Sequence, residues 1–525
     1  MPLRGLWIGA VLSALALGLS ACGQSAPPRS FAIVSGSENK ILEPIVADFC
    51  RTKSVDCKFT YQGSLDIGFA LRSGTIPFDA VWPASSLWID MYDAGRKVKH
   101  VQSIAQMPVI LGVRMGKAKE LGWVGKPVTM ADVLGAVTAG KLRYLMTSAT
   151  QSNSGASAYL AMLSTALGDT QSLEKKDLEN PELRKKVQTL LRAVERSAGS
   201  SSWLSDLYVD TARNGHPYDA MWNYEALLKE ANDALAKAGK EQLYAIYPVD
   251  GVAIADSPLG FIDRGAGPDA EKFFLELQAF LLAKDSAQKI AATGRRVPLS
   301  DVKGTPESNW NFDPGRRVTA IRAPEREVIQ RALNVYQEAL RKPSLTGICL
   351  DFSGSMAQNG GEPQLQAAMK SLLTPEEAAA QLIQWTPGDH IVVVPFSDHN
   401  VAVYEGAGTP EDQAKLLSSV RGHRAEGGTD MYTCAQEVLG RMTANKAAGD
   451  FLPAIIIMTD GRTEGSASGF ERAWRASGGA IPVFGVTFGD ADVTQLDAMA
   501  KLTGGRVFDG AKDLSGAFRA TRGYN

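Results

Sequence analysis

Short apolar segments alternate with longer amphipathic segments in two series along this chain. The first series begins with FAIVSG at residue 31, and the second begins with LTGICL at residue 345. Apolar runs of about four to eight residues are typical of buried strands, whereas apolar residues recurring at helical spacing are typical of amphipathic helices. Such alternation predicts mostly parallel sheets with helices on both faces, so we predict an α/β fold.

The 525 residues are too many for one hydrophobic core, and a break in the pattern divides them. Residues 303–323 contain Pro and Gly and have no periodicity, and one helical segment follows them before the second series. We therefore predict a first globular unit over residues 31–302, a connector with a linking helix over residues 303–343, and a second globular unit over residues 344–525.

The composition excludes some classes of function. A formal net charge of −2 and scattered Lys and Arg residues leave no basic face for nucleic acid, so no nucleic-acid partner is expected. The GxSxG, HExxH and GxxxxGK[ST] motifs are all missing, and the five His residues form no cluster with ligand spacing. We therefore do not expect an enzyme.

The N-terminal segment MPLRGLWIGAVLSALALGLSACGQ has one Arg, an apolar stretch and small residues before Cys22. This layout is typical of a secretory signal, predicted over residues 1–21, and the apolar stretch is too short for a membrane span. Residues 19–22, LSAC, resemble a bacterial lipobox, which implies cleavage and lipidation at Cys22; the alternative is a plain signal peptide with a chance Cys. We predict a flexible tether over residues 22–30 and a lipid-anchored protein of the cell envelope that faces the periplasm or the cell exterior.

Four cysteines follow Cys22, an even number in a chain that we expect to be exported. Cys50 and Cys57 are separated only by RTKSVD, where a helix ends and a strand begins, so we predict a disulfide between them. Cys349 lies on an apolar strand and Cys434 follows GGTDMYT. We expect these last two to be buried thiols rather than a bridge.

Hydroxyl residues recur in the first unit where predicted strands give way to helices. Hydroxyls and free N–H groups at helix N-termini can hold an oxyanion without any Lys or Arg, although each of these residues is also an ordinary helix cap. The candidate ligand-binding hydroxyls are Ser35, Ser37, Ser64, Ser85, Ser86, Ser148 and Thr150.

The order and spacing of SGSENKILEP, YQGSLDIGFALRSGTIPFDAVWPASSLWI, TSATQSNSGASAY and YDAMWNYEALL resemble type II periplasmic solute-binding proteins, close in style to molybdate- or sulfate-type receptors. The resemblance implies two α/β lobes joined by crossing strands, with the ligand in the cleft between them.

The class of solute stays open at this point, because the aromatic and acidic residues suit different ligands. The aromatic side chains could stack on an organic ligand or equally belong to the core; they are Trp82, Trp222 and Tyr224, and we take Trp222 as a candidate ligand residue. The acidic side chains would repel an anion if they faced the cleft; they are Glu38, Asp66, Asp79 and Asp219.

The second unit has the sequence DFSGSM at residues 351–356, directly after the apolar LTGICL. Asp351, Ser353 and Ser355 thus place one carboxylate and two hydroxyls at the tip of a predicted strand. These residues are ordinary in turns and caps. They are also hard oxygen ligands of the kind that Mg²⁺ prefers.

The Asp-x-Ser-x-Ser pattern resembles the metal ion-dependent adhesion site of von Willebrand factor A domains, and residues 345–525 resemble that family over their full length. In the family, a Thr and an Asp from two later loops complete the site; GGTDMY supplies Thr429 and IIIMTDG supplies Asp460. The resemblance implies a Rossmann-like domain that holds one Mg²⁺ or Mn²⁺. A cation held mainly by neutral hydroxyls stays electrophilic, so an acidic side chain of a protein partner can complete its coordination.

These features together predict a membrane-anchored binding or adhesion protein in which the metal site is coupled to a solute-binding cleft. The alternative is a substrate-binding receptor of an ABC importer for an oxyanion or small solute. An attached adhesion-like domain favours the first hypothesis, because importer receptors normally work alone.

Overall fold

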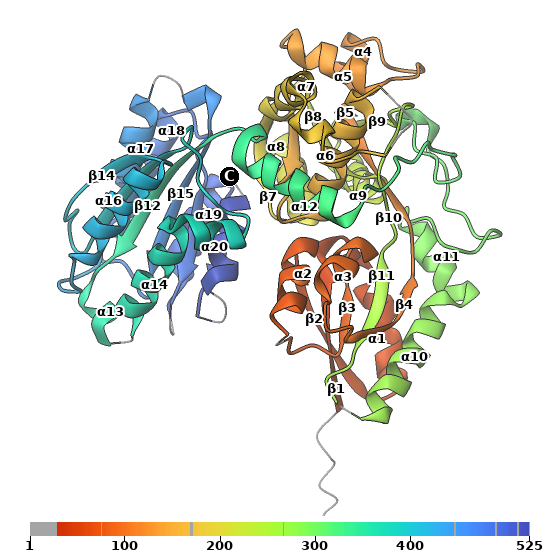
Figure 1. Cartoon of the computed structure of the whole chain (residues 1–525), viewed down its shortest axis with the longest axis horizontal. Helices are drawn as coiled ribbons and strands as arrows, with labels where there is room; N and C mark the ends of the chain where they lie inside the picture. Colours follow the sequence, from red (N-terminus) through yellow and green to blue (C-terminus); the bar gives the residue numbers. More distant parts are fainter. Residues whose placement is uncertain are drawn as a thin grey trace, which may run out of the picture.

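The computed structural model describes residues 29–74, 76–168, 172–265, 267–358, 360–445, 448–488, 491–511 and 514–523. The described residues form three sheets, of five, six and six strands. Figure 1 shows two stacked lobes, each built on one sheet, and a third α/β part beside them. The predicted signal peptide and the lipidation residue Cys22 lie outside the described residues.

The first lobe is a sheet with the strand order β2-β1-β3-β11-β4, in which β11 and β4 are antiparallel to each other and β11 is antiparallel to β3. Its strands are β1 (Arg29–Gly36), β2 (Val55–Gln62), β3 (Ala80–Trp82), β4 (Val98–Ser103) and β11 (Pro258–Ile262). Its helices are η1 (Ser37–Leu42), α1 (Glu43–Thr52), α2 (Ser64–Ser73), α3 (Ser86–Tyr92), α10 (Pro268–Leu282) and α11 (Lys284–Ala292).

The second lobe has the strand order β10-β5-β8-β6-β7, and β9 pairs with β5. Its strands are β5 (Met107–Arg114), β6 (Tyr144–Thr147), β7 (Val194–Ala198), β8 (Ala220–Tyr224), β9 (Leu243–Ile246) and β10 (Ile254–Ala255). Its helices are α4 (Met115–Glu120), α5 (Met130–Thr138), α6 (Asn153–Ala166), η2 (Asp177–Glu179), α7 (Pro181–Arg192), α8 (Ser201–Arg213) and α9 (Glu225–Lys237).

Three strands do not stand out as short apolar runs in the sequence. The edge strand β4 has the polar sequence VKHVQS, β7 has two charged residues, and β11 begins with Pro258. Polar edge strands and strands that begin with Pro lack the alternating apolar signal on which the prediction of strands depends. Of these three, β4 and β11 are also the strands that carry the chain between the lobes, because β4 leads into β5 and β10 leads into β11.

The segment that we expected to be a connector packs tightly on the second lobe. Its elements are η3 (Ser308–Trp310), α12 (Arg326–Val335) and the π-helix η4 (Tyr336–Leu340). The rings of Trp310 and Phe312 stack at 4.7 Å in the core, and the Tyr159 hydroxyl of α6 donates to the Ala332 carbonyl of α12 at 2.9 Å. Burial of this apolar surface fixes the start of the third part against the second lobe.

The third part is a sheet with the order β14-β13-β12-β15-β16-β17, parallel except for the edge strand β14. Its strands are β12 (Ser344–Asp351), β13 (His390–Phe396), β14 (Tyr404–Ala407), β15 (Leu452–Thr459), β16 (Val483–Thr487) and β17 (Val507–Asp509). Its helices are α13 (Gly354–Gln358), α14 (Gly361–Leu373), α15 (Pro375–Ala380), α16 (Pro410–Arg421), α17 (Met431–Ala444), η5 (Ala448–Asp450), α18 (Ala467–Ala476), α19 (Thr494–Thr503) and α20 (Leu514–Gly523).

This strand order reverses direction at the central strand β12, which pairs with β13 on one side and with β15 on the other. In open sheets of this kind, ligands bind beyond the carboxyl ends of the strands at the point of reversal. The described strand β12 ends at Asp351 and β15 ends at Thr459, so the DFSGSM turn lies at this point.

Two segments with apolar residues at helical spacing, residues 268–292 and 361–380, are each divided into two helices. The chain is extended at Ala283, which separates α10 from α11, and at Thr374, which separates α14 from α15. Pro375 begins α15, and the residue before a proline is sterically biased away from the helical region. Apolar periodicity continues across such a break, which is why the pattern alone does not reveal it.

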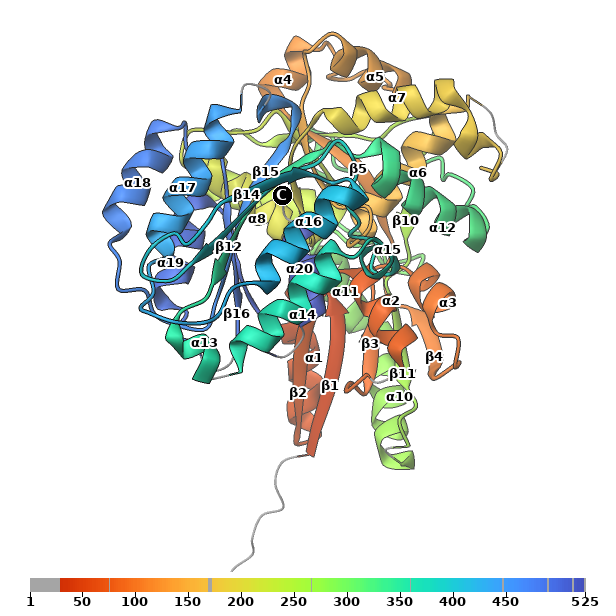
Figure 2. The same ribbon diagram turned by 60° about the vertical axis from the view of Figure 1, so that its left-hand side comes forward.

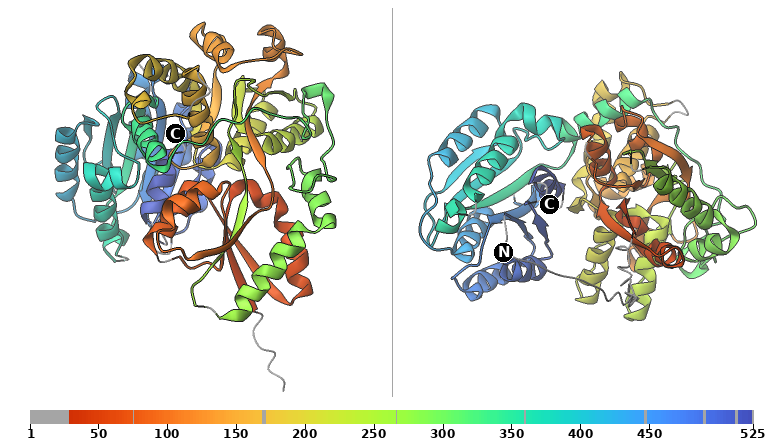
Figure 3. Two further views of the ribbon diagram at one scale, coloured as in Figure 1. Left: turned by 45° about the vertical axis from the view of Figure 1, so that its right-hand side comes forward. Right: turned by 90° about the horizontal axis from the view of Figure 1, so that it is seen from below.

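The third part packs against both lobes, with α20 at the boundary (Figure 2). Ala454 and Phe484 of its sheet belong to one apolar cluster with Leu204 and Tyr208 of α8. The Arg196 guanidinium of β7 donates to the Gly504 carbonyl at 3.0 Å. The view from below in Figure 3 shows the same side-by-side packing. The two α/β units therefore share a continuous core rather than a flexible joint.

Candidate metal centre and interlobe cleft

The carboxylate of Asp351 is fully buried and is oriented by two hydrogen bonds. Its Oδ1 accepts from the Ser353 N–H at 2.7 Å, and its Oδ2 accepts from the Thr459 hydroxyl at 2.5 Å. Burial raises the pKa of Asp351 above its usual range, and the negative charge of Asp460 acts in the same direction. A cation at this point would offset the cost of keeping both carboxylates ionised.

The two serine hydroxyls connect this carboxylate turn to the end of β15. The Oγ atoms of Ser353 and Ser355 lie 3.1 Å apart, and the Ser355 hydroxyl donates to Asp460 Oδ1 at 2.8 Å. Ser355 is partly exposed, whereas Ser353 is buried. The oxygens thus form a short chain that opens to solvent at one side, which leaves access for a ligand from outside.

The loop with Thr429 lies beside the same turn. The Gly354 N–H donates to the Gly427 carbonyl at 3.0 Å, and the Glu426 N–H donates to the Phe352 carbonyl at 2.7 Å. The carbonyl of Thr429 accepts from the Thr463 hydroxyl at 3.1 Å, which ties the loop to the segment after β15. Three loops that are distant in sequence are therefore held together at the carboxyl ends of β12 and β15.

The set of oxygen donors fits a small, hard divalent cation. The carboxylates of Asp351 and Asp460 and the hydroxyls of Ser353 and Ser355 form one chain of contacts, with the Thr429 loop beside it, and Mg²⁺ and Mn²⁺ prefer oxygen ligands. In the parts of the chain that the structure describes, no group of three or more His, Cys, Asp or Glu residues could hold a metal ion, so this candidate depends on its hydroxyls. Sequence reasoning did not identify Thr459, because a Thr at a strand end carries no motif.

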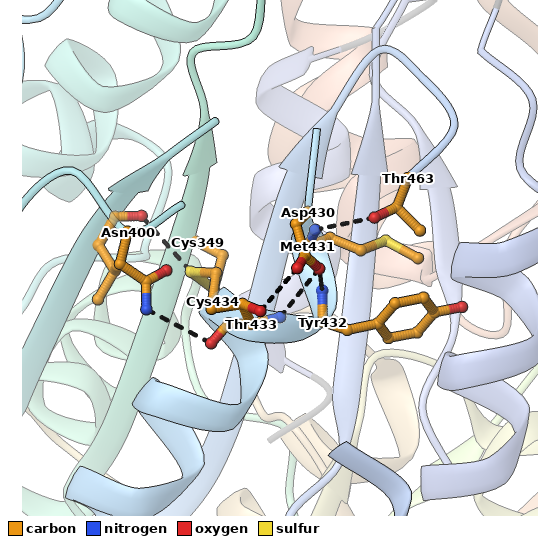
Figure 4. Close-up of a disulfide and its surroundings, with 9 residues drawn as sticks. Cys349, Asn400, Asp430, Met431, Tyr432, Thr433, Cys434 and Thr463 are labelled. Atoms are coloured by element: carbon orange, nitrogen blue, oxygen red, sulfur yellow. Dashed lines mark hydrogen bonds between the residues drawn. A yellow bond between two sulfur atoms is a disulfide. The ribbon is translucent and has the colours of Figure 1, made fainter. Parts of the chain in front are cut away.

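A disulfide between Cys349 and Cys434 joins the two elements that carry the metal-site loops (Figure 4). Our expectation of two separate thiols was wrong, because β12 and α17 pack directly on each other and their Cys Cα atoms lie 6.0 Å apart. Cys349 precedes Asp351 by two positions on β12, and Cys434 lies in the first turn of α17, just after Thr429.

The start of α17 is further held by its N-cap. Asp430 Oδ1 accepts from the N–H groups of Tyr432 and Thr433, each at 3.1 Å, and the Met431 N–H donates to the Thr463 hydroxyl at 3.1 Å. Figure 4 shows these contacts beside the disulfide. The cap and the disulfide together fix the loop that ends in Thr429.

A second disulfide joins Cys50 at the end of α1 to Cys57 on β2, as expected from their spacing. It lies in the first lobe and spans seven positions in sequence.

The candidate solute residues of the first lobe make hydrogen bonds within the protein. Ser35 is buried and donates to the Trp82 carbonyl at 3.3 Å, and the Ser64 hydroxyl accepts from the Ala84 N–H at 3.0 Å. Ser85 caps α3 through the Leu87 N–H at 3.3 Å, and the Ser86 N–H donates to Asp256 Oδ1 at 2.8 Å. These four positions lie where strands of the first lobe give way to helices.

Ser37 lies at the contact between the lobes. Its hydroxyl accepts from the Ser202 N–H at 3.2 Å, and its carbonyl accepts from the Ser202 hydroxyl at 2.7 Å. The Trp88 indole of α3 also donates across the lobes, to Asn153 Oδ1 at 2.8 Å, and the Leu65 N–H donates to the Gln151 carbonyl at 3.1 Å. The two lobes are thus in direct contact, in a closed arrangement.

The candidate solute residues of the second lobe, Trp222, Ser148 and Thr150, make none of these interlobe hydrogen bonds. Trp222 is buried in the core, where its ring meets the ring of Tyr144 edge to face at a centroid distance of 6.2 Å. Of the two alternatives that the sequence left open for this side chain, a ligand residue or a core residue, the structure shows the second. The hydroxyls of Ser148 and Thr150 lie 3.2 Å apart and line a small cavity at the boundary with the third part. The structure therefore does not bring all the predicted solute residues together.

A buried polar cluster lies at the interlobe contact, and two of its members, Tyr224 and Glu38, are among the possible cleft residues that the sequence suggested. Besides Asn153, it includes Tyr224, whose hydroxyl accepts from Asn153 Nδ2 at 3.0 Å, and Glu38, which is 4% exposed. Burial raises the pKa of Glu38 to about 7, although the charge of Arg295 acts in the opposite direction. The sequence analysis did not identify Asn153, because the cluster exists only when the lobes meet.

The other acidic residues of the first unit have cationic neighbours. Asp79 pairs with Arg264 within the first lobe, and Asp219 lies 3.5 Å from Arg114 within the second lobe. Asp66 lies 2.9 Å from Arg519 of the third part. These pairings reduce the electrostatic repulsion that the acidic side chains would exert on an anion.

Arg519 on α20 reaches from the third part to both lobes. Its Nε lies 2.9 Å from Asp66 Oδ1 of α2, and its guanidinium lies over the ring of Phe69 at 4.2 Å. Its carbonyl accepts a hydrogen bond from the side chain of Gln151 in the second lobe. Because Asp66 and Gln151 belong to different lobes, α20 connects all three parts.

Two family models match this chain. The model described as bacterial extracellular solute-binding protein matches residues 32–296, and that of the von Willebrand factor type A domain matches residues 347–515. No curated protein matches the chain. Within the described ranges, every helix is too short or too polar to cross a membrane.

Solved structures with similar folds have low sequence identity. The periplasmic binding protein AfuA from Actinobacillus pleuropneumoniae is 14% identical, with 59% of this chain and 98% of that chain covered and a TM-score of 0.44. The sulfate-binding protein SubI from Mycobacterium tuberculosis is 18% identical, with 52% and 88% covered and a TM-score of 0.39. A von Willebrand factor type A protein from Catenulispora acidiphila is 20% identical, with 35% and 43% covered and a TM-score of 0.30.

The family matches confirm the predicted fold class, a two-lobed periplasmic-binding-protein-like unit followed by a Rossmann-like domain. The families are binding and adhesion types, and the solute-binding family is extracellular by its description. The chain belongs to the bacterial extracellular solute-binding proteins and has a von Willebrand factor type A domain, here the VWA domain, after its two lobes.

Proposed function

We propose that this protein is a cell-envelope binding protein whose VWA domain captures an acidic side chain of a protein partner through Mg²⁺ or Mn²⁺. The observation that carries the proposal is the chain of contacts Asp351–Ser353–Ser355–Asp460 at the reversal point of the sheet. The test compares partner capture from envelope extracts with and without a chelator, as set out in the Discussion.

Each residue has a distinct role in the proposed site. Ser353, Ser355 and Thr429 would ligate the cation directly through neutral oxygens. Asp351 and Asp460 would balance its charge through bound waters, and the Thr459 hydroxyl would keep Asp351 oriented. The bound cation supplies an electrophilic coordination position, and the partial exposure of Ser355 would let a partner carboxylate reach it.

We further propose that the VWA domain and the interlobe cleft are coupled through α20. Opening of the cleft separates Asp66 from Gln151, and both residues contact Arg519. A solute that favours one lobe arrangement would therefore change the position or stability of α20, and the effect is reciprocal by linkage.

Replacement of Arg519 by Ala should loosen the closed lobe arrangement. The change removes the ion pair with Asp66 and leaves a mostly buried carboxylate, so we expect a loss of up to about 3 kcal/mol in the free energy of unfolding. The Leu65 N–H, which donates across the lobes, should exchange faster with solvent deuterium. Arg462→Ala is the matched control, because Arg462 is 75% exposed. Equal exchange of Leu65 in both variants would contradict the coupling.

The alternative function is a substrate-binding receptor of an ABC importer for an oxyanion or small solute. The match to the solute-binding family supports it, and so do similar folds named as sulfate- and molybdate-binding proteins, although their identity to this chain is low. A thermal-shift screen of oxyanions and small metabolites distinguishes the two functions. A stabilising ligand that cells also take up through this protein favours the importer, whereas one that is not transported favours a sensor.

Replacement of Cys22 by Ser should release the protein from membranes. The lipobox-like LSAC at residues 19–22 motivates this expectation, because lipidation requires the Cys thiol. The measurement is the distribution of the full chain between membrane and soluble fractions, with Ser20→Ala as a control in the same segment. Unchanged membrane retention of the Cys22→Ser protein would exclude the anchor.

A further inference from the structure

We propose that the cavity at the junction of the second lobe, the linking helix and the VWA domain binds a small monoatomic anion, chloride in ordinary buffers. Neither the metal site nor the interlobe cleft includes this cavity. Its volume is about 30 Å³, and residues of all three parts line it. They include Ser148, Thr150, Arg341, Ser344 and Arg522.

The charges around the cavity do not balance. Arg341 forms a two-point ion pair with the fully buried Asp389, with one Nη1–Oδ1 distance of 2.8 Å. Arg522 reaches the same carboxylate through the Ser344 hydroxyl, which accepts from Arg522 Nη1 at 2.9 Å and donates to Asp389 Oδ1 at 3.0 Å. Burial alone would raise the pKa of Asp389, but the charges of Arg341 and Arg522 lower it. Asp389 therefore offsets only one of two guanidinium groups.

Among the described residues, Arg522 has no carboxylate of its own as a partner. Its Nη1 donates to the hydroxyls of Ser344 at 2.9 Å and Thr346 at 3.3 Å, and its guanidinium lies 3.6 Å from the centre of the Trp385 ring. Its Nε and that of Arg341 are shielded from solvent and have no hydrogen-bond partner among the described residues. Each is an N–H donor that still requires an acceptor.

An arginine cannot remove this excess charge by losing its proton. Burial and the neighbouring Arg341 lower the pKa of Arg522 to about 9, which leaves it protonated at neutral pH. A third cation that lines the cavity, Lys342, has Glu195 and Asp450 near it and donates to the Val194 carbonyl at 3.4 Å. The uncompensated charge thus belongs to the Arg341–Asp389–Arg522 group, and an anion would neutralise it.

The volume and the lining residues of the cavity determine which kind of anion it can hold. A cavity needs about 10–15 Å³ to hold one water molecule, so this one has room for a single ion or one to two waters but not for sulfate or phosphate. The hydroxyls of Ser148 and Thr150 can turn their hydrogens toward an anion, whereas the Ser344 hydroxyl already donates to Asp389 Oδ1 at 3.0 Å. Ser148 and Thr150, which the sequence suggested as oxyanion ligands in the cleft, would thus serve an anion at the domain junction.

The experiment measures the thermal stability of the full chain in sodium chloride, bromide and gluconate at equal ionic strength. Gluconate is too large for the cavity, so the melting temperature should be higher in the halides by a few degrees and should saturate with halide concentration. Anomalous diffraction from bromide-soaked crystals should place one ion among Arg341, Arg522 and Ser344. Equal melting temperatures in all three salts with no bromide at this position would overturn the proposal and indicate ordered water instead.

Substitutions test whether the difference in melting temperature between halide and gluconate arises at this cavity. Arg522→Gln removes the excess charge, so it should abolish the difference between halide and gluconate, whereas the exposed control Arg462→Gln should retain it. If Arg522→Gln does not fold, Ser148→Ala removes one hydroxyl from the cavity lining and should weaken halide binding several-fold. An unchanged halide effect in Arg522→Gln, or an unchanged halide affinity in Ser148→Ala, would mean that the ion acts elsewhere. Partner capture by the metal site is measured in a separate experiment, so a negative result for the anion cavity does not affect the test of metal-dependent partner binding.

Discussion

Removal of the metal, or replacement of Asp351 by Ala, is expected to abolish partner binding while the VWA domain stays folded. Loss of the buried carboxylate leaves only Asp460 to balance the charge of the dication, so we expect metal affinity to fall by at least about 100-fold. The fold should persist because the sheet has its own apolar core around β12 and β15. The measurements are calorimetric titration with Mg²⁺ and Mn²⁺ and a pull-down from envelope extracts.

The controls separate loss of metal from loss of a surface charge. Asp497→Ala removes a carboxylate of α19 that pairs with Lys501 away from the site, and it should bind metal and partners normally. Thr459→Val keeps all five proposed site residues but removes the hydrogen bond to Asp351, and it should lower metal affinity about tenfold. The adhesion hypothesis fails if the same partners are captured by the wild type and by Asp351→Ala, with and without a chelator.

Loss of the Cys349–Cys434 disulfide is expected to give the largest decrease in stability. The bridge spans 85 positions in sequence, and a loop of this length corresponds to about 4–5 kcal/mol in the chain-entropy account. The double variant Cys349→Ala/Cys434→Ala should therefore have a free energy of unfolding lower by several kcal/mol. Because the bridge joins the strand that ends at Asp351 to the helix that follows Thr429, metal affinity should also fall.

The first-lobe disulfide is the matched control for this experiment. Cys50 and Cys57 are only seven positions apart, so Cys50→Ala/Cys57→Ala should cost about 2–3 kcal/mol and leave metal affinity unchanged. Chemical denaturation and metal titration of both double variants test the pair. Equal metal affinity in all three proteins would show that the N-cap at Asp430 alone is sufficient to position the Thr429 loop.

The sequence by itself determined the α/β class and both families, because these depend on local signals. Apolar runs and amphipathic spacing identify strands and helices one at a time, and the order of DFSGSM, GGTDMY and IIIMTDG along the chain is independent of distant contacts. The cysteine spacing around RTKSVD similarly predicts the short bridge that the structure contains. The metal itself and the lipid at Cys22 remain predictions.

Only the tertiary structure decided which residues from distant segments meet. Cys349 and Cys434 pair because β12 packs on α17, and Arg519 reaches Asp66 because the VWA domain packs on both lobes. Ser148 and Thr150 line one cavity together with Arg341 and with Arg522 of α20 for the same reason. Such contacts result from burial of apolar surface between elements far apart in sequence, and no local pattern of residues encodes which elements will pack together.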